Sequence, residues 1–198
     1  MEFITSDLHF GHKNIYGPDG FCPKTRGHFE TLEEMNEYLI EAHNSVVGKK
    51  DTTYFLGDFS LHMDRDEALE ILNAMNGQFH FIKGNHDNRS LINYLKANNY
   101  KISKGMDKFI VHEVGTIVKR NGNIYYLTHY PLQLGVRRQL RSLCGHLHDE
   151  AVNLPYSLNV GIDSPELPEG HPFGVPLEFS VACELVEKKL KESKESEK

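Results

Sequence analysis

The first twelve residues place the strongest constraint on the fold. An apolar, β-branched run over residues 3–5 ends abruptly, and Asp7, His9, Gly11 and His12 follow it. This pattern predicts a buried strand that delivers two metal-ligating side chains at its carboxyl end. On an extended backbone the side chains of Asp7 and His9 point the same way, so that one cation can bind both. Taken alone, an Asp-x-His pair is common and gives weak support for a metal site.

The same arrangement recurs along the chain. Four later segments have a predicted strand followed by candidate ligands: residues 52–56 before Gly57-Asp58, residues 79–82 before Gly84-Asn85-His86-Asp87, residues 125–128 before His129, and residues 143–144 before Gly145-His146-Leu147-His148. A single histidine at a strand end is more often structural. Two imidazoles in a His-x-His pair on one strand edge suit one or two adjacent cations.

Helices are predicted between the strands of the first half. Thr31 and Glu34 form a capping box that opens a helix ending at Gly48, and Asp64 caps a second helix ending at Gly77. A third helix is expected over residues 88–98. The alternation of strands and helices predicts parallel strands with helices on the outer face of the sheet.

Beyond residue 105 the pattern changes to short strands separated by turn signals. Three are predicted, over residues 108–112, 116–119 and 124–127. The Asn121-Gly122-Asn123 sequence indicates a hairpin between the last two. We therefore expect a second, more antiparallel sheet that faces the first. A final helix is expected near residues 180–190.

Composition restricts the class of protein. The 198 residues suit one domain over residues 1–190, followed by a charged tail over residues 191–198 that frays. No segment approaches the length of a membrane span, and we expect a cytoplasmic protein. Three widely spaced cysteines argue against a disulfide framework. The net charge of -6 argues against extended nucleic acid as a partner, although bound cations would reverse the local field for a phosphorylated substrate.

In their order along the chain, these segments resemble the signature of the calcineurin-like metallophosphoesterase superfamily. Five blocks carry the resemblance: Asp7-x-His9, Gly57-Asp58, Gly84-Asn85-His86-Asp87, His129 and Gly145-His146-x-His148. The opening segment is similar to that of small, stand-alone bacterial and phage members. The resemblance implies an α/β fold, a four-layer α/β/β/α sandwich of two facing mixed sheets flanked by helices.

The resemblance also implies a hydrolase with two divalent metal ions. The implied ligands fall into two sets that share Asp58 as a bridge: Asp7, His9 and His148 for the first ion, and Asn85, His129 and His146 for the second. Such mixed ligands suit Mn, Fe, Zn, Ni or Co, with Mn favoured. A hydroxide bridging the two ions would attack phosphorus.

Two residues of the implied site have roles beyond metal binding. By the same resemblance, His86 would lie near the leaving group as a proton donor or charge stabiliser. Asp87 would orient His86, or it would cap the following helix, and the sequence leaves these two readings open.

The sequence constrains the substrate least. His12, Arg26, Arg137 and Arg138 are candidates for contacts with a substrate phosphate, together with Arg141 in the same cluster. Solvation of a surface loop is the alternative for each arginine. We expect a small nucleotide-like phosphodiester or monoester as substrate. The alternatives are a phosphoprotein phosphatase and a catalytically silent metal-binding scaffold on the same fold. The presence of every implied ligand and of His86 favours an enzyme.

Overall fold

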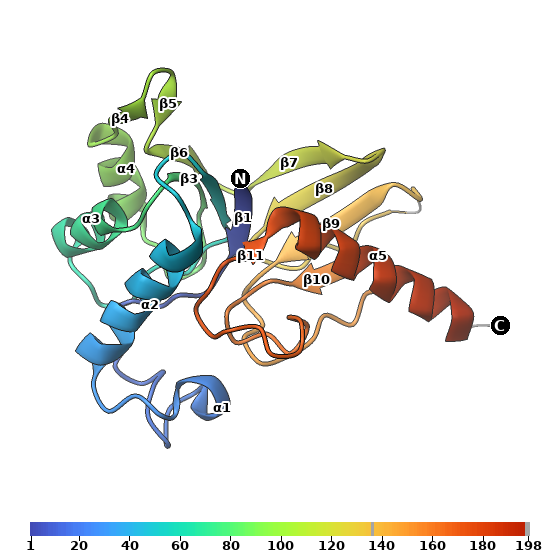
Figure 1. The fold of residues 1–198 in the computed structure, drawn as a ribbon, viewed down its shortest axis with the longest axis horizontal. Coiled ribbons are helices and arrows are strands. Elements are labelled where there is room, and N and C mark those ends of the chain that lie inside the picture. Colours follow the sequence, from blue (N-terminus) through green and yellow to red (C-terminus); the bar gives the residue numbers. More distant parts are fainter. Residues whose placement is uncertain (136, 197–198) are drawn as a thin grey trace.

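Two β-sheets face each other and are flanked by helices in the computed structural model, which describes residues 1–135 and 137–196 (Figure 1). This arrangement confirms the predicted α/β sandwich. The first sheet has the strand order β11-β1-β2-β3-β6. Its strands are β1 (Glu2–Thr5), β2 (Thr52–Phe55), β3 (Gln78–Ile82), β6 (Phe109–His112) and β11 (Leu177–Glu178). All neighbours in this sheet are parallel except β11, which is antiparallel to β1.

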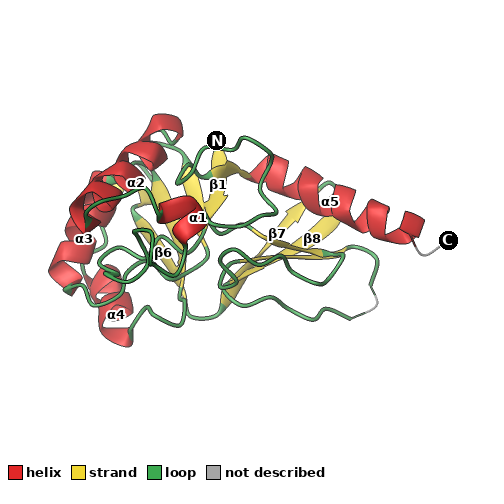
Figure 2. Ribbon diagram, turned by 90° about the horizontal axis from the view of Figure 1, so that it is seen from below, coloured by secondary structure: helices red, strands yellow, loops and turns green. Residues whose placement is uncertain are grey.

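Three helices pack against the first sheet: α2 (Leu32–Val46), α3 (Arg65–Ala74) and α4 (Arg89–Ala97). Figure 2 shows them together on one side of the molecule. Their apolar residues, such as Met35, Leu72 and Ile92, join Phe55 and Phe81 of the sheet in one buried cluster. The predicted caps are confirmed for α2 and α3, because the Thr31 and Asp64 side chains accept hydrogen bonds from first-turn N–H groups.

The second sheet has the strand order β10-β9-β8-β7. Its strands are β7 (Gly115–Arg120), β8 (Asn123–Thr128), β9 (Leu140–Cys144) and β10 (Ser157–Asn159). The predicted hairpin joins β7 to β8. Its turn residues Asn121 and Gly122 have φ values of 49° and 78°, as the turns that match the strand twist require.

Two expectations about the second half are wrong. Strand β6 belongs to the first sheet, where Phe109 pairs with Phe79, so the second sheet begins only at β7. The second sheet is also largely parallel, because β9 pairs in parallel with both β8 and β10. Parallel neighbours need a long connection that returns the chain to the same end of the sheet, and the turn signals between short strands do not reveal one.

The remaining elements complete the sandwich. Helix α5 (Phe179–Ser196) packs against β1, β10 and β11, and its Val186 joins Ile4 and Leu143 of the two sheets in a second buried cluster. This helix continues beyond residue 190 to Ser196, and residues 197–198 of the expected tail lie outside the described residues. The short helix α1 (Pro23–Arg26) and the strands β4 (Lys101–Ser103) and β5 (Met106–Asp107) were not expected.

None of the helices in the described part of the chain is both long and apolar enough to cross a membrane. The fold gathers the candidate ligands at one end of the sheets. The parallel strands β1, β2 and β3 of the first sheet, and β8 and β9 of the second, end in the loops that carry the candidate ligands.

Candidate metal centre

The loops after the strands hold the candidate ligands in an uncommon backbone conformation. Asp7, His9, Asp58, His146 and His148 all have φ values between 47° and 71°. The left-handed region is sparsely populated by residues other than glycine, and it persists where neighbouring structure imposes it. Strand β1 ends at residue 5, so the predicted extended geometry of the Asp-x-His pair is wrong. The side chains converge because their loops are left-handed, not because a strand aligns them.

Hydrogen bonds between the first two loops impose this conformation. The N–H groups of Asp7 and His9 donate to the carbonyls of Gly57 and Asp58 over 3.0 and 3.1 Å. The backbone N–H of His146 donates to both carboxylate oxygens of Asp7 over 3.1 and 2.9 Å. The loops of the two sheets are therefore joined through a ligand side chain.

Glycine is required where these loops meet. A Cβ at Gly84 would lie 2.2 Å from Asp58 Oδ1, and one at Gly145 would lie 2.4 Å from Asp7 Oδ2. Contacts this short do not occur, so any side chain at either position would displace a carboxylate. Each glycine thus precedes one candidate ligand and makes room for another.

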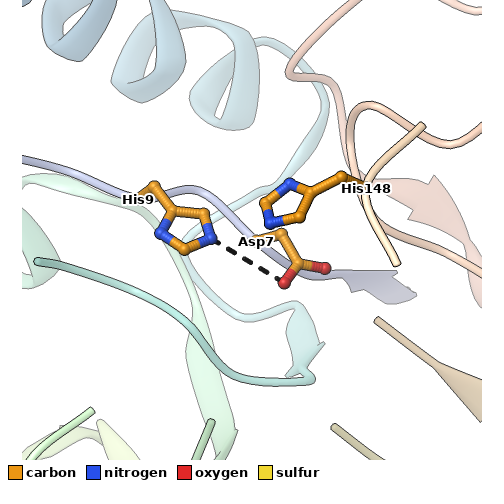
Figure 3. Close-up of side chains that lie close together, drawn as sticks. All are labelled: Asp7, His9 and His148. Atoms are coloured by element: carbon orange, nitrogen blue, oxygen red, sulfur yellow. Dashed lines mark ion pairs between the residues drawn. The ribbon is translucent and has the colours of Figure 1, made fainter. Parts of the chain in front are cut away.

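The first cluster of side chains contains Asp7, His9 and His148, one ligand atom of each lying within 4.8 Å of the others. Figure 3 shows the rings of His9 and His148 close to each other and next to the Asp7 carboxylate, with His9 Nε2 4.0 Å from Asp7 Oδ1. His9 and Asp7 are buried and His148 is half-buried. The structure therefore brings together the three residues implied for the first ion.

The second cluster contains Asp58, His129 and His146 within the same limit. Asp58 Oδ2 lies 3.4 Å from His129 Nε2 and 3.7 Å from His9 Nε2, so this carboxylate stands between the two clusters. His129 Nδ1 donates to the Leu56 carbonyl over 2.8 Å, which directs Nε2 toward the site. Asn85 Oδ1 lies 2.7 Å from that Nε2.

Burial and neighbouring charges together set the protonation of these side chains. Desolvation raises the pKa of Asp7 to about 6 and lowers the pKa of His9 to about 2. Burial also raises the pKa of Asp58, but the hydrogen bond and charge of His129 outweigh it and lower that pKa to about 2. At neutral pH His9 is a neutral imidazole beside carboxylates, which is the protonation state that metal binding needs.

His9 gives the most direct test of whether a cation fits. Its side chain is 1% exposed, and neither ring nitrogen has a hydrogen-bond partner among the described residues. A buried polar atom without a partner costs about 1–3 kcal/mol, and native structures keep few of them. An ion held by imidazole and carboxylate donors would bind His9, so the residues present fit a divalent transition metal.

A cleft of about 390 Å³ opens beside the clusters and is lined by residues that include His9, His12, Phe21, His86 and His148. The ring of His12 lies 5.5 Å from that of His9. His86 donates its backbone N–H to Asp58 Oδ1 over 2.8 Å, and its Nε2 lies 3.9 Å from Asp58 Oδ2. Because the His86 side chain is 37% exposed, it can reach a bound molecule.

Asp87 has neither of the two roles considered for it. Its carboxylate accepts the backbone N–H groups of Asp58, Phe59 and Gly84 over 2.9, 3.0 and 2.9 Å. Helix α4 is capped by Asn88 instead. Asp87 therefore fixes the loop that carries Asp58.

The arginines expected to contact substrate lie elsewhere. Arg26 is fully buried and pairs with Asp163, so the prediction that it meets a substrate phosphate is wrong. Arg137 and Arg138 are exposed, but they precede β9 and so lie at the end opposite His146. Strand β9 separates them from the site by roughly 16 Å at about 3.3 Å per residue. Arg141 pairs with Glu187 of α5.

Sequence reasoning missed other residues at the site. Asp163 lies 3.6 Å from His148 Nδ1, and Cys22 Sγ lies 3.8 Å from the same atom. Phe21 and Tyr130 are 72% and 51% exposed, and their rings lie next to those of His12 and His146 respectively. Asp163 follows an apolar segment after β10, as the other carboxylates follow their strands, and this was the signal available for it.

Comparison with known proteins gives the family. The sequence profile described as calcineurin-like phosphoesterase matches residues 3–163, and the chain belongs to this family. An uncharacterised protein of Methanocaldococcus jannaschii is 34% identical over 134 residues, which are 65% of this chain and 73% of that protein. The gene 66 protein of Mycobacterium phage L5 is 37% identical over 87 residues, which are 43% of this chain and 39% of the phage protein.

A solved structure supports the fold. The crystal structure of a protein of unknown function from Aquifex aeolicus superposes with a TM-score of 0.65, covering 93% of this chain and 98% of that one. The two sequences are 21% identical, so this similarity concerns the fold alone. Membership in the family means that the chain is a metal-dependent phosphoesterase in general terms.

Proposed function

We propose that this protein hydrolyses small phosphate diesters or monoesters, with a nucleotide-like phosphodiester favoured, at a centre of two divalent transition-metal ions. The observation that carries the proposal is the position of Asp58, whose Oδ2 lies within 3.7 Å of an imidazole nitrogen from each ligand cluster. A carboxylate between two such clusters is suited to bridging two ions.

The proposed ligands divide between the two ions. Asp7, His9 and His148 would hold the first ion, Asn85, His129 and His146 would hold the second, and Asp58 would bridge them. Mn²⁺ is our preferred ion among Mn, Fe, Zn, Ni and Co, because the donors are oxygen and imidazole nitrogen. Divalent cations bound here would neutralise phosphate charge and lower the pKa of water at the site.

His86 is the proposed proton donor. Its backbone is tied to Asp58 while its ring stands at the edge of the cleft. From that position Nε2 can donate a proton to the leaving oxygen as the ester bond breaks. Asp87 would act only indirectly, by fixing the loop of Asp58 through its three backbone hydrogen bonds.

Exposed aromatic rings support a substrate with a planar group. Phe21 lines the cleft and Tyr130 lies against the second cluster, and most of the surface of each remains free. Base stacking on an aromatic side chain is worth about 1–3 kcal/mol. No arginine among the described residues lines the cleft, so the proposed ions and histidines would meet the phosphate charge.

The test is hydrolysis by chelator-stripped protein to which Mn²⁺, Ni²⁺, Zn²⁺ or Mg²⁺ is restored singly. We expect metal-dependent release from bis-p-nitrophenyl phosphate above that from p-nitrophenyl phosphate. Preference for the monoester would point to a phosphatase. No release with any metal, despite two ions bound, would support the scaffold alternative and overturn the proposal.

The role of His86 is tested separately. His86→Ala should keep both ions and lose turnover most on esters with poor leaving groups, because these need the proton. His171, whose Nε2 contacts the Val175 carbonyl, offers a matched control in His171→Ala. A loss in His86→Ala that is uniform across leaving-group pKa would contradict an acid role.

A further inference from the structure

We propose that Arg26 and Asp163 form a positioning pair that holds the first ligand set in place for its cation and makes no direct contact with the second set. This inference rests on the proposed metal centre. It concerns two residues that are not ligands themselves and do not touch the substrate.

The Asp163 carboxylate faces one ring nitrogen of His148. Asp163 Oδ2 lies 3.6 Å from His148 Nδ1, and the Asp163 side chain is fully buried. Figure 3 shows the other ring nitrogen of His148 next to the Asp7 carboxylate. A carboxylate behind one nitrogen of an imidazole fixes the ring orientation and leaves the opposite nitrogen to bind metal. Asn159 supports the same segment by donating its side-chain N–H to the His148 carbonyl over 3.0 Å.

Asp163 is itself held in place by hydrogen bonds from Arg26 and Thr25. Arg26 Nε donates to its two carboxylate oxygens over 3.0 and 3.2 Å, and Nη2 donates to Oδ2 over 2.6 Å. Thr25 adds a hydroxyl donor to Oδ1. Both charged side chains are fully buried. A planar guanidinium can form this fork, and a lysine ammonium cannot.

Arg26 also connects the pair to the loop that follows β1. Arg26 Nη1 donates to the Leu8 carbonyl over 2.9 Å and Nη2 donates to the Asp7 carbonyl over 2.7 Å. These carbonyls belong to the left-handed segment that presents Asp7 and His9. One guanidinium thus contacts the backbone carrying two proposed ligands and the carboxylate that faces the third.

Apart from the His146 N–H, which donates to the Asp7 carboxylate, the second ligand set has a different support. Asp58 is fixed through Asp87, and His129 through the Leu56 carbonyl. No hydrogen bond in the described part of the chain joins Arg26 or Asp163 to these residues. A positioning role therefore predicts loss of affinity at one metal site, whereas a purely structural ion pair would affect both sites through the stability of the fold.

The experiment uses two full-length backgrounds, each with one proposed site. In His129→Ala only the first proposed site keeps all its ligands, and in His148→Ala only the second does. Stripped protein is titrated calorimetrically with Mn²⁺ with and without Asp163→Asn. We expect Asp163→Asn to weaken binding about 10–100-fold in the His129→Ala background. In the His148→Ala background it should change affinity less than twofold.

Glu187→Gln is the matched control. Glu187 is another carboxylate that accepts hydrogen bonds from an arginine, Arg141, through both of its oxygens, but it lies on α5 and does not contact His148. This variant should lower the thermal midpoint without changing affinity in either background. Thr25→Val keeps the ion pair and should weaken Mn²⁺ binding at the first site alone, by a smaller factor. This variant replaces Asp163→Asn in the experiment if Asp163→Asn does not fold.

The outcomes separate this inference from the proposed function. Equal weakening in both backgrounds, or none in either, would overturn the positioning role while leaving the metal centre intact. Wild-type protein that binds no cation would overturn both.

Discussion

Replacing Gly145 with alanine tests whether close packing between the loops sets the geometry of the centre. The added Cβ would lie 2.0 Å from Ser6 Oγ and 2.4 Å from Asp7 Oδ2, where ordinary contact begins at 3.4 Å. The Asp7 carboxylate would therefore have to move by about 1 Å. Overpacking of this kind costs about 1–3 kcal/mol. A misplacement of about 1 Å near reacting groups can cost about 100-fold in rate.

Two assays measure this effect. The kcat/KM for bis-p-nitrophenyl phosphate with Mn²⁺ should fall about 100-fold in Gly145→Ala. The thermal midpoint should fall by about 2–4 °C for each kcal/mol lost, as for chains of this size. Gly135→Ala is the matched control, because no described atom lies within 4 Å of a Cβ added there. Gly145→Ala with turnover within twofold of wild type and an unchanged midpoint would refute the packing argument.

Three further predictions concern acid stability and substrate contacts. Burial lowers the pKa of His43 to about 4 in the folded chain. As the pH falls below 6.5, His43 is therefore protonated in the unfolded chain before it is protonated in the folded chain. Chelated wild type should lose about 2 kcal/mol more than His43→Gln between pH 7 and pH 5 in urea unfolding, and equal losses would contradict this. Phe21→Ala should raise KM for aryl or nucleotide diesters roughly tenfold with kcat unchanged, whereas Tyr100→Ala, at an exposed ring on another surface, should not. Arg137→Ala with Arg138→Ala should leave kcat/KM within twofold, and a tenfold loss would place these arginines at the substrate.

The sequence predicts the helices and strands of this fold better than it predicts which strands pair with each other. Thr31, Asp64 and the Asn121-Gly122 turn act through neighbours in the chain, so that local rules identify them. The pairing of β6 with β3 depends on contacts between residues far apart in sequence, such as Phe109 and Phe79. Short apolar strands carry little information about which sheet they join.

For the candidate site, too, the sequence predicts one part and not another. Residue types and their order indicate which side chains gather, and the structure brings Asp7, His9 and Asp58 together. The means of gathering is not visible in the sequence, because left-handed conformations of residues other than glycine are imposed by tertiary hydrogen bonds. Arg26 illustrates the limit, since an arginine in a polar loop is typically exposed, and only the fold supplies the buried Asp163 that pairs with it.

The central claim is that Asp58 bridges two cations, and a count of bound metal tests it most directly. Stripped protein reconstituted with Mn²⁺ and freed of excess ion should hold two ions per chain by elemental analysis. Asp58→Asn should lose bound metal and turnover together, whereas Asp107→Asn, which alters an acid paired with Lys101 on the β4–β5 hairpin, should keep both. Two ions at full occupancy in Asp58→Asn would contradict the account.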